Sequence, residues 1–282
     1  MERISTIRGW KIHHQERLYF KGHAGTPILT VKFFQYPEYR QTVQIEKSPE
    51  HCKLKVNKMN SFFIYRHQVG TKGMISFNRF VNIFPHDSFI NLDEDWGNIS
   101  DFTLPLQMKY LQSSRFWPVN SVFLKEVCHE SWFETDDLSD WVQSACRYVS
   151  SKIIHRENQE RRLGAYDAFL RGLGDCEEFT DLFITFARMR GIPCRRLTGY
   201  FIRKNKRFIA EAHAWSEILS PKIGFIPIDV TLNNLGNHNL NYVILKIEEF
   251  NPSLPDYEIS TVRSVSMHYH WERPDPIFTP IY

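Results

Sequence analysis

The sequence has no long apolar run. No stretch approaches the roughly 20 apolar residues that a membrane-spanning helix needs. The first ten residues, MERISTIRGW, also lack the apolar segment of a secretory signal. We therefore expect a soluble cytoplasmic protein that has no membrane partner.

Cysteine is scarce as well. The chain has 5 cysteines, widely spaced and odd in number: Cys52, Cys128, Cys146, Cys176 and Cys194. Without a C-x-x-C pair, neither a disulfide framework nor a cysteine zinc site is indicated. The histidines at 13–14 and 268–270 have no carboxylate or cysteine spaced to complete a metal site. We expect reduced thiols, no metal and no cofactor.

There is no large net charge, because 35 Lys and Arg face 32 Asp and Glu. A global field that would attract nucleic acid is thus excluded.

One local exception is residues 188–207, which hold eight Arg or Lys and no acid. We interpret this run as a solvated surface with RKNKR, 203–207, as a hairpin tip. An acidic substrate and a carrier protein remain open as its partners. Because no interleaved aromatic residues support nucleic acid, we expect no nucleic-acid partner.

Internal repeats, low-complexity segments and Gly/Ser linkers are also missing, so we expect two directly packed domains in the 282 residues. Short β-branched and aromatic segments, such as PILTVKFFQY and SFFIYRHQV, recur between turn formers through the first hundred residues. This pattern is typical of a β-rich, sandwich-like unit. We predict a β-rich N-terminal domain over 1–105 and a second domain over 106–282.

The apolar period changes to that of helices after about residue 120. Apolar residues of LSDWVQSACRYVSSKI recur at helical spacing, with Asp136 or Asp137 as N-cap. Shorter helices are expected in SVFLKEVCHE and GAYDAFLRG. The tail after residue 256 alternates and then fills with proline, so we expect it to add an edge strand to the sheet of the second domain.

Cys176 stands at the start of a predicted helix. In GDCEEFTDLFITFARMRGIP the apolar residues keep helical spacing, and Asp175 and Glu178 form a capping-box pattern around the cysteine. A thiol at a helix N-terminus lies in the positive end of the helix dipole, which favours the thiolate. Although buried cysteines are common, this position suits a nucleophile.

A thiolate nucleophile needs a base, and the base needs an orienting group. RFIAEAHAWSEILS and FIPIDVT read as strands on either side of the loop SPKIG. If the strands pair as a hairpin, His213 and Asp229 face the same side, opposite or diagonal to each other. Cys176, His213 and Asp229 are therefore expected to converge.

These segments together resemble the core of the transglutaminase-like superfamily, which has a papain-like Cys-His-Asp fold. The resemblance lies in GDC, the apolar helix, GIP, HAW and the strand that ends at Asp, and it runs from about Tyr110 to Val230. It implies an α+β fold, with helices packed on an antiparallel sheet, and a catalytic domain over 106–282 that follows the β-rich one. It also implies that Cys176 is the nucleophile, His213 the general base and acid, and Asp229 the residue that orients His213.

The residue types define the chemistry. The Cys176 thiolate attacks an acyl carbon, the backbone N–H of Cys176 donates to the oxyanion, and His213 protonates the leaving amine. The resulting thioester is resolved by water or by an amine, so the acyl transfer on amide or peptide substrates is either hydrolysis or transamidation. Two alternatives stay open: amide-bond synthesis from a carrier-bound thioester, with the carrier at the basic hairpin, and a non-catalytic binding module. The second oxyanion donor is not assigned.

Overall fold

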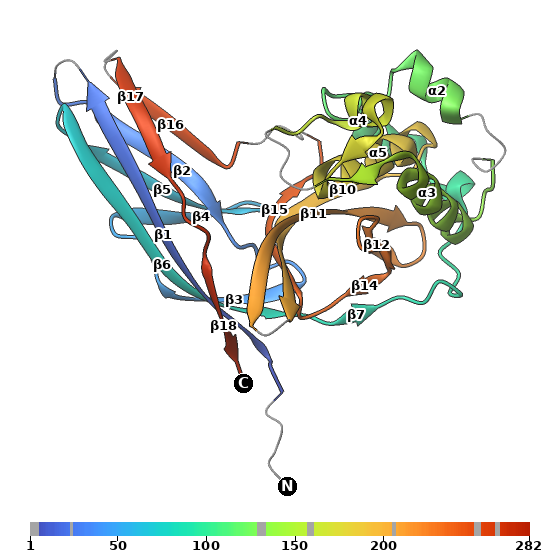
Figure 1. Ribbon diagram of the computed structural model, residues 1–282, viewed down its shortest axis with the longest axis horizontal. Coiled ribbons are helices and arrows are strands. Elements are labelled where there is room, and N and C mark those ends of the chain that lie inside the picture. The colour runs from blue at the N-terminus through green and yellow to red at the C-terminus, as the bar shows by residue number, and fades with distance from the viewer. Residues whose placement is uncertain are drawn as a thin grey trace, which may run out of the picture.

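The computed structural model describes residues 6–22, 25–128, 134–156, 161–204, 207–250, 255–262 and 266–282. Figure 1 shows a β-rich part beside a part in which helices cover a sheet. No helix within these residues is long and apolar enough to cross a membrane. The division of the chain into two domains near residue 105 stays a prediction.

The β-rich region consists of two antiparallel sheets. One has the order β17-β1-β6-β3, with β18 also paired to β1, and the other has the order β16-β2-β5-β4. Apolar side chains from both sheets, such as Leu18 and Val31, are buried between them, as the alternating pattern predicts. The strands from the N-terminal part of the chain are β1 (Gly9–Gly22), β2 (Ile28–Gln35), β3 (Gln41–Lys47), β4 (Cys52–Val56), β5 (Ser61–Gln68) and β6 (Lys72–Pro85).

The tail of the chain also belongs to the β-rich region. Strand β16 (Tyr257–Val262) pairs with β2, whereas β17 (Met267–Glu272) and β18 (Ile277–Ile281) pair with β1. The prediction that the tail extends the sheet of the second domain is therefore wrong. Side-chain amides of Gln41 and Asn60 already bind the backbone of that sheet's edge strand at Ile244 and Ile247. This part of the edge is thus not free to pair with another strand.

The second part has a five-stranded antiparallel sheet, which we call the core sheet, of order β13-β12-β11-β10-β15. Its strands are β10 (Cys194–Lys204), β11 (Phe208–Ser220), β12 (Gly224–Asp229), β13 (Asn234–Leu235) and β15 (Tyr242–Glu248). Short pairs flank it: β7 (Ser88–Phe89) with β14 (Asn237–His238), and β8 (Ile154–His155) with β9 (Leu173–Gly174).

Helices cover one face of the core sheet (Figure 1). They are the 3-10 helix η1 (Ile99–Asp101), α1 (Leu104–Tyr110), α2 (Val122–Cys128), α3 (Leu138–Lys152), α4 (Ala165–Arg171) and α5 (Cys176–Met189). The fully buried Phe183 and Phe186 of α5 share an apolar core with Trp141 of α3 and with Ile218 and Ile226 of the sheet. Asp137 caps α3 by accepting from the backbone N–H of Asp140 at 2.8 Å, as predicted. Burial of this face holds the start of α5 against β10 and β11.

Candidate active site

Helix α5 begins at Cys176, as the capping pattern predicts. The Asp175 carboxylate accepts from the backbone N–H of Glu177 at 2.9 Å, and the Glu178 carboxylate accepts from the backbone N–H of Asp175 at 3.1 Å. The two acids thereby satisfy backbone donors at the helix start. This leaves the half-buried Cys176 side chain fixed on the first helical turn.

The Glu178 side chain fills the space next to Gly174, the glycine of the G-D-C motif. Its fully buried carboxylate also accepts from the backbone N–H of Leu163 at 2.7 Å. A Cβ atom on Gly174 would lie 2.4 Å from Glu178 Cβ, so a larger residue at 174 cannot be accommodated there without a shift. Burial raises the pKa of Glu178 to about 7, although both backbone hydrogen bonds oppose this rise.

His213 and Asp229 meet across the hairpin of β11 and β12. The register pairs Ser216 with Ile228, which sets Asp229 opposite Trp215 and diagonal to His213 on the same face. His213 Nε2 lies 2.7 Å from Asp229 Oδ2, and both side chains are buried. The predicted contact between the two side chains is therefore present, in its diagonal form.

The thiol completes the constellation. Burial disfavours the charged form of His213, but hydrogen bonds to Asp229 and to Cys176, together with attraction to both groups, outweigh it and raise its pKa to about 9. The Trp215 ring is stacked on the imidazole, with centroids 5.9 Å apart and planes inclined by 19°. The structure thus brings Cys176, His213 and Asp229 together, while their catalytic roles stay a prediction.

Sequence reasoning missed a fourth side chain at this site. Tyr242 of β15 is buried, and its hydroxyl donates to Asp229 Oδ2 at 2.9 Å. Its strand reaches the site by pairing with β10, whose Phe201 stands opposite Tyr242. The local sequence gave no signal for this contact, because it depends on how β15 returns to the sheet.

Three arginines of the basic run are buried, so the prediction of a solvated surface is wrong for Arg188, Arg195 and Arg196. Arg196 lies beside helix α5, with its guanidinium 2.6 Å from Glu177. Asp181 and Glu248 lie within 4 Å of the same guanidinium. Of the predicted tip, Arg203, Lys204 and Arg207 are exposed, while Asn205 and Lys206 lie outside the described residues.

The carboxylates near Cys176 are occupied by protein donors. Oxygens of Asp175, Glu177 and Glu178 lie within 4.8 Å of one another. However, Asp175 and Glu178 accept backbone N–H groups, and Glu177 pairs with Arg196. The cluster is therefore explained by helix capping and one ion pair.

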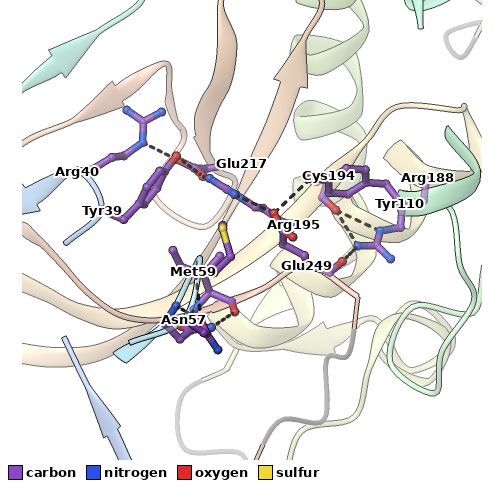
Figure 2. A network of polar contacts seen from close by, with 12 residues as sticks. Tyr39, Arg40, Asn57, Met59, Tyr110, Arg188, Cys194, Arg195, Glu217 and Glu249 are labelled. Atoms are coloured by element: carbon purple, nitrogen blue, oxygen red, sulfur yellow. Dashed lines mark hydrogen bonds and ion pairs between the residues drawn. The ribbon is translucent and has the colours of Figure 1, made fainter. Parts of the chain in front are cut away.

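A second buried carboxylate lies further along β11. Figure 2 shows Glu217 between Tyr39 and Arg40 of the β-rich region and Arg195 of β10. Arg195 Nη2 lies 2.7 Å from Glu217, and Arg40 also donates to the backbone carbonyl of Phe225. We call these four side chains the Glu217 cluster: Tyr39, Arg40, Arg195 and Glu217. It joins the β-rich region to the core sheet on the face that carries His213.

The network continues from the Glu217 cluster toward helix α1. Arg195 Nη1 lies 3.1 Å from the Glu249 carboxylate, to which the Tyr110 hydroxyl also donates. Arg188 donates to the backbone carbonyls of Cys194 and Glu249 (Figure 2). The buried Arg195 is thus paired with carboxylates, and the buried Arg188 guanidinium is hydrogen-bonded to backbone carbonyls, so both are compensated for the loss of water.

The family model of the transglutaminase-like superfamily matches residues 127–230, a range that contains Cys176, His213 and Asp229. No curated protein matches the chain. A candidate cysteine protease of Cytophaga hutchinsonii is similar in structure, with a TM-score of 0.62 and 17% identity over 97% of this chain and 94% of that one.

Two further solved structures are more distant. The periplasmic domain of TgpA from Pseudomonas aeruginosa, bound to ethylmercury, has a TM-score of 0.39 and 14% identity, covering 78% of this chain and 90% of that one. A candidate protease of Parabacteroides distasonis has a TM-score of 0.33 and 11% identity, covering 82% and 47%.

The predicted α+β fold class is confirmed, because the Cytophaga structure covers both the sheets of the β-rich region and the helix-covered sheet. The predicted family is confirmed by the match of its model to the segment that carries the site. Residues 127–230 of this chain therefore form a core of the transglutaminase-like superfamily, preceded by a β-rich N-terminal region.

Proposed function

We propose that the chain is a thiol-dependent acyl-transfer enzyme that acts on amide or peptide substrates through a thioester on Cys176. The observation that carries this proposal is the position of His213, which interacts electrostatically with Cys176 and lies 2.7 Å from Asp229. A histidine between a thiol and a carboxylate can take a proton from the one while the other orients its ring.

The charge state of His213 supports the same assignment. With a pKa raised to about 9, the imidazole is protonated near neutral pH when the thiol has given up its proton. The resulting imidazolium stabilises a thiolate at Cys176, and the dipole of α5 adds to this effect. The site therefore holds a nucleophile and an acid ready for a leaving group.

In the first half of the reaction, Cys176 Sγ forms a bond to the acyl carbon and the carbon–nitrogen bond breaks. The proton on His213 passes to the departing amine, which leaves a thioester and a neutral imidazole. In the second half, water or an amine attacks the thioester and gives its proton to His213. The carbon–sulfur bond then breaks and Cys176 leaves as thiolate beside the imidazolium. The backbone N–H of Cys176 is on the first helical turn and is assigned to the oxyanion.

Alkylation of the native protein by chloroacetamide at about pH 6 tests the thiolate, because an ordinary thiol with pKa near 8.5 is almost fully protonated there. Peptide mass spectrometry maps the modified cysteine. We expect Cys176 to react at least about tenfold faster than Cys52, and His213→Ala to remove that advantage. His86→Ala is the matched control, since the exposed His86 ring contacts Thr42 and not Cys176.

The proposal is overturned if Cys176 in the folded parent reacts no faster than Cys52, or if His213→Ala leaves its rate unchanged. Incubation with amide and thioester substrates then separates the outcomes of the second half-reaction. Mass spectrometry detects an acyl group on Cys176, and its product with water or with an added amine distinguishes hydrolysis from transamidation.

A further inference from the structure

Several contacts hold the Tyr242 side chain next to Asp229. Its side chain is buried, and its ring contacts those of Phe201 and Trp215, with centroids 4.9 Å and 5.2 Å away. The Asn234 side-chain amide donates to the Tyr242 hydroxyl at 2.8 Å. Since that bond uses the hydroxyl as acceptor, the O–H of Tyr242 is directed to its other neighbour, Asp229 Oδ2.

The Asp229 carboxylate therefore has three donors. Oδ1 accepts from the backbone N–H of Leu232 at 3.1 Å, whereas Oδ2 is shared between His213 at 2.7 Å and Tyr242 at 2.9 Å. Three bonds fix both the plane of the carboxylate and its position along the His213 ring. Of the two side-chain donors, His213 takes part in the proposed proton transfer and Tyr242 does not.

The strand of Tyr242 is held at this distance from two sides. On β10, Gly199 stands opposite His213 and next to a register shift with β15, and a Cβ atom there would lie 1.9 Å from the Val243 carbonyl oxygen. On the other edge, the Gln41 amide binds both backbone groups of Ile244. The close approach that brings Tyr242 to Asp229 thus depends on the glycine and on the β-rich region.

We propose that Tyr242, oriented by Asn234, is a positioning residue that sets how strongly Asp229 holds the His213 proton. This inference rests on the proposed function, which it extends by one residue. Oδ2 divides its hydrogen-bonding capacity between the imidazole and the phenol. If the phenol is removed, the carboxylate charge acts on the imidazolium alone, so His213 binds its proton more tightly and becomes a weaker acid toward the leaving amine.

The other titratable groups that face His213, Asp229 and Tyr242 are the same in the parent and in Tyr242→Phe. They are Cys176 of α5, Cys146 of α3, Arg203 of β10 and His238 of β14. A change in the titration of His213 on removal of one phenol oxygen is therefore attributable to Tyr242.

The test is the titration of the His213 imidazole by NMR in the parent and in Tyr242→Phe, with the resonance assigned by its loss in His213→Gln. Tyr242→Phe keeps the ring contacts and removes only the O–H donor. We expect the pKa of His213 to rise by about half a unit or more, as for the loss of a hydrogen bond to a charged group. Asn234→Ala, which frees the hydroxyl, is expected to raise it by less.

Tyr36→Phe is the matched control, because it also removes a buried tyrosine hydroxyl bonded to a histidine, His14, at 2.7 Å, in the β-rich region. The inference is overturned if Tyr242→Phe and the parent titrate together, or if Tyr36→Phe shifts His213 equally. Chloroacetamide alkylation of the same samples keeps the two proposals apart. A parent that lacks selective reactivity at Cys176 contradicts the proposed function, whereas a reactive parent with an unshifted variant contradicts only the role of Tyr242.

Discussion

Two buried carboxylates on one face of the core sheet have opposite kinds of partner. Asp229 binds an imidazole, which can give up and take back a proton, whereas Glu217 lies between two guanidiniums, Arg40 and Arg195, which cannot. Both carboxylates are neutralised, but only the first pair can exchange a proton. The part of the face around Asp229 is therefore suited to proton transfer, whereas the part around Glu217 joins the core sheet to the β-rich region.

The largest effect on folding is expected from Glu217→Gln. Loss of this charge leaves Arg40 and Arg195 facing each other across a neutral amide in a buried site. Breaking a buried ion pair from one side costs about 3–5 kcal/mol. Chemical denaturation measures the change in unfolding free energy. Glu211→Gln is the control, because Glu211 pairs with Arg203 at the exposed surface and its loss should be nearly silent. Equal losses in the two variants would contradict the role of the Glu217 cluster.

The same comparison shows which contacts a sequence can predict. The capping box around Cys176 and the diagonal pair His213 and Asp229 are set by short-range rules, namely helix capping and the two-residue period of a hairpin. Glu217 shares that period with His213. Had β10 and β11 been paired as a hairpin, Arg195 would have been placed opposite Glu217, as observed. This signal was present in the sequence and was missed.

Other contacts have no local signal. Arg40 reaches Glu217 from a loop 177 positions away in the chain, and Tyr242 reaches Asp229 because β15 returns beside β10. The alternation of apolar and polar residues in the tail correctly predicted strands. A two-residue period, however, shows only that a strand has two different faces, and it does not specify which sheet the strand joins. The pairing of β17 with β1 is accordingly a result of the tertiary structure.

A smaller effect, specific to the Asp229 pair, is expected from pH. Because the pKa of folded His213 is raised to about 9, above about 6.5 in an unfolded chain, its contribution to stability is fully present below pH 6.5. That contribution is lost as the pH rises through about 9, and it amounts to about 3 kcal/mol. The difference in unfolding free energy between the parent and His213→Gln should shrink over this interval. Taking the difference cancels the titration of Glu178, whose raised pKa of about 7 lowers stability as the pH rises from its ordinary value toward 7. A difference that is constant from pH 6 to 10 would contradict the assignment.

The smallest effect is expected from Arg40→Gln, which removes only the guanidinium that the β-rich region contributes. Arg195 remains 2.7 Å from Glu217, so the carboxylate is still neutralised and the cost falls to that of hydrogen bonds with a charged partner, about 1.5–3 kcal/mol. The exposed Arg203→Gln is the matched control, with a loss of at most about 1 kcal/mol. Because Arg40 touches neither His213 nor Asp229, selective alkylation of Cys176 should persist in the folded variant. If Arg40→Gln instead abolished that reactivity without a loss of stability, the Glu217 cluster would have to act on the imidazole itself, and the separation of the two carboxylates would fail.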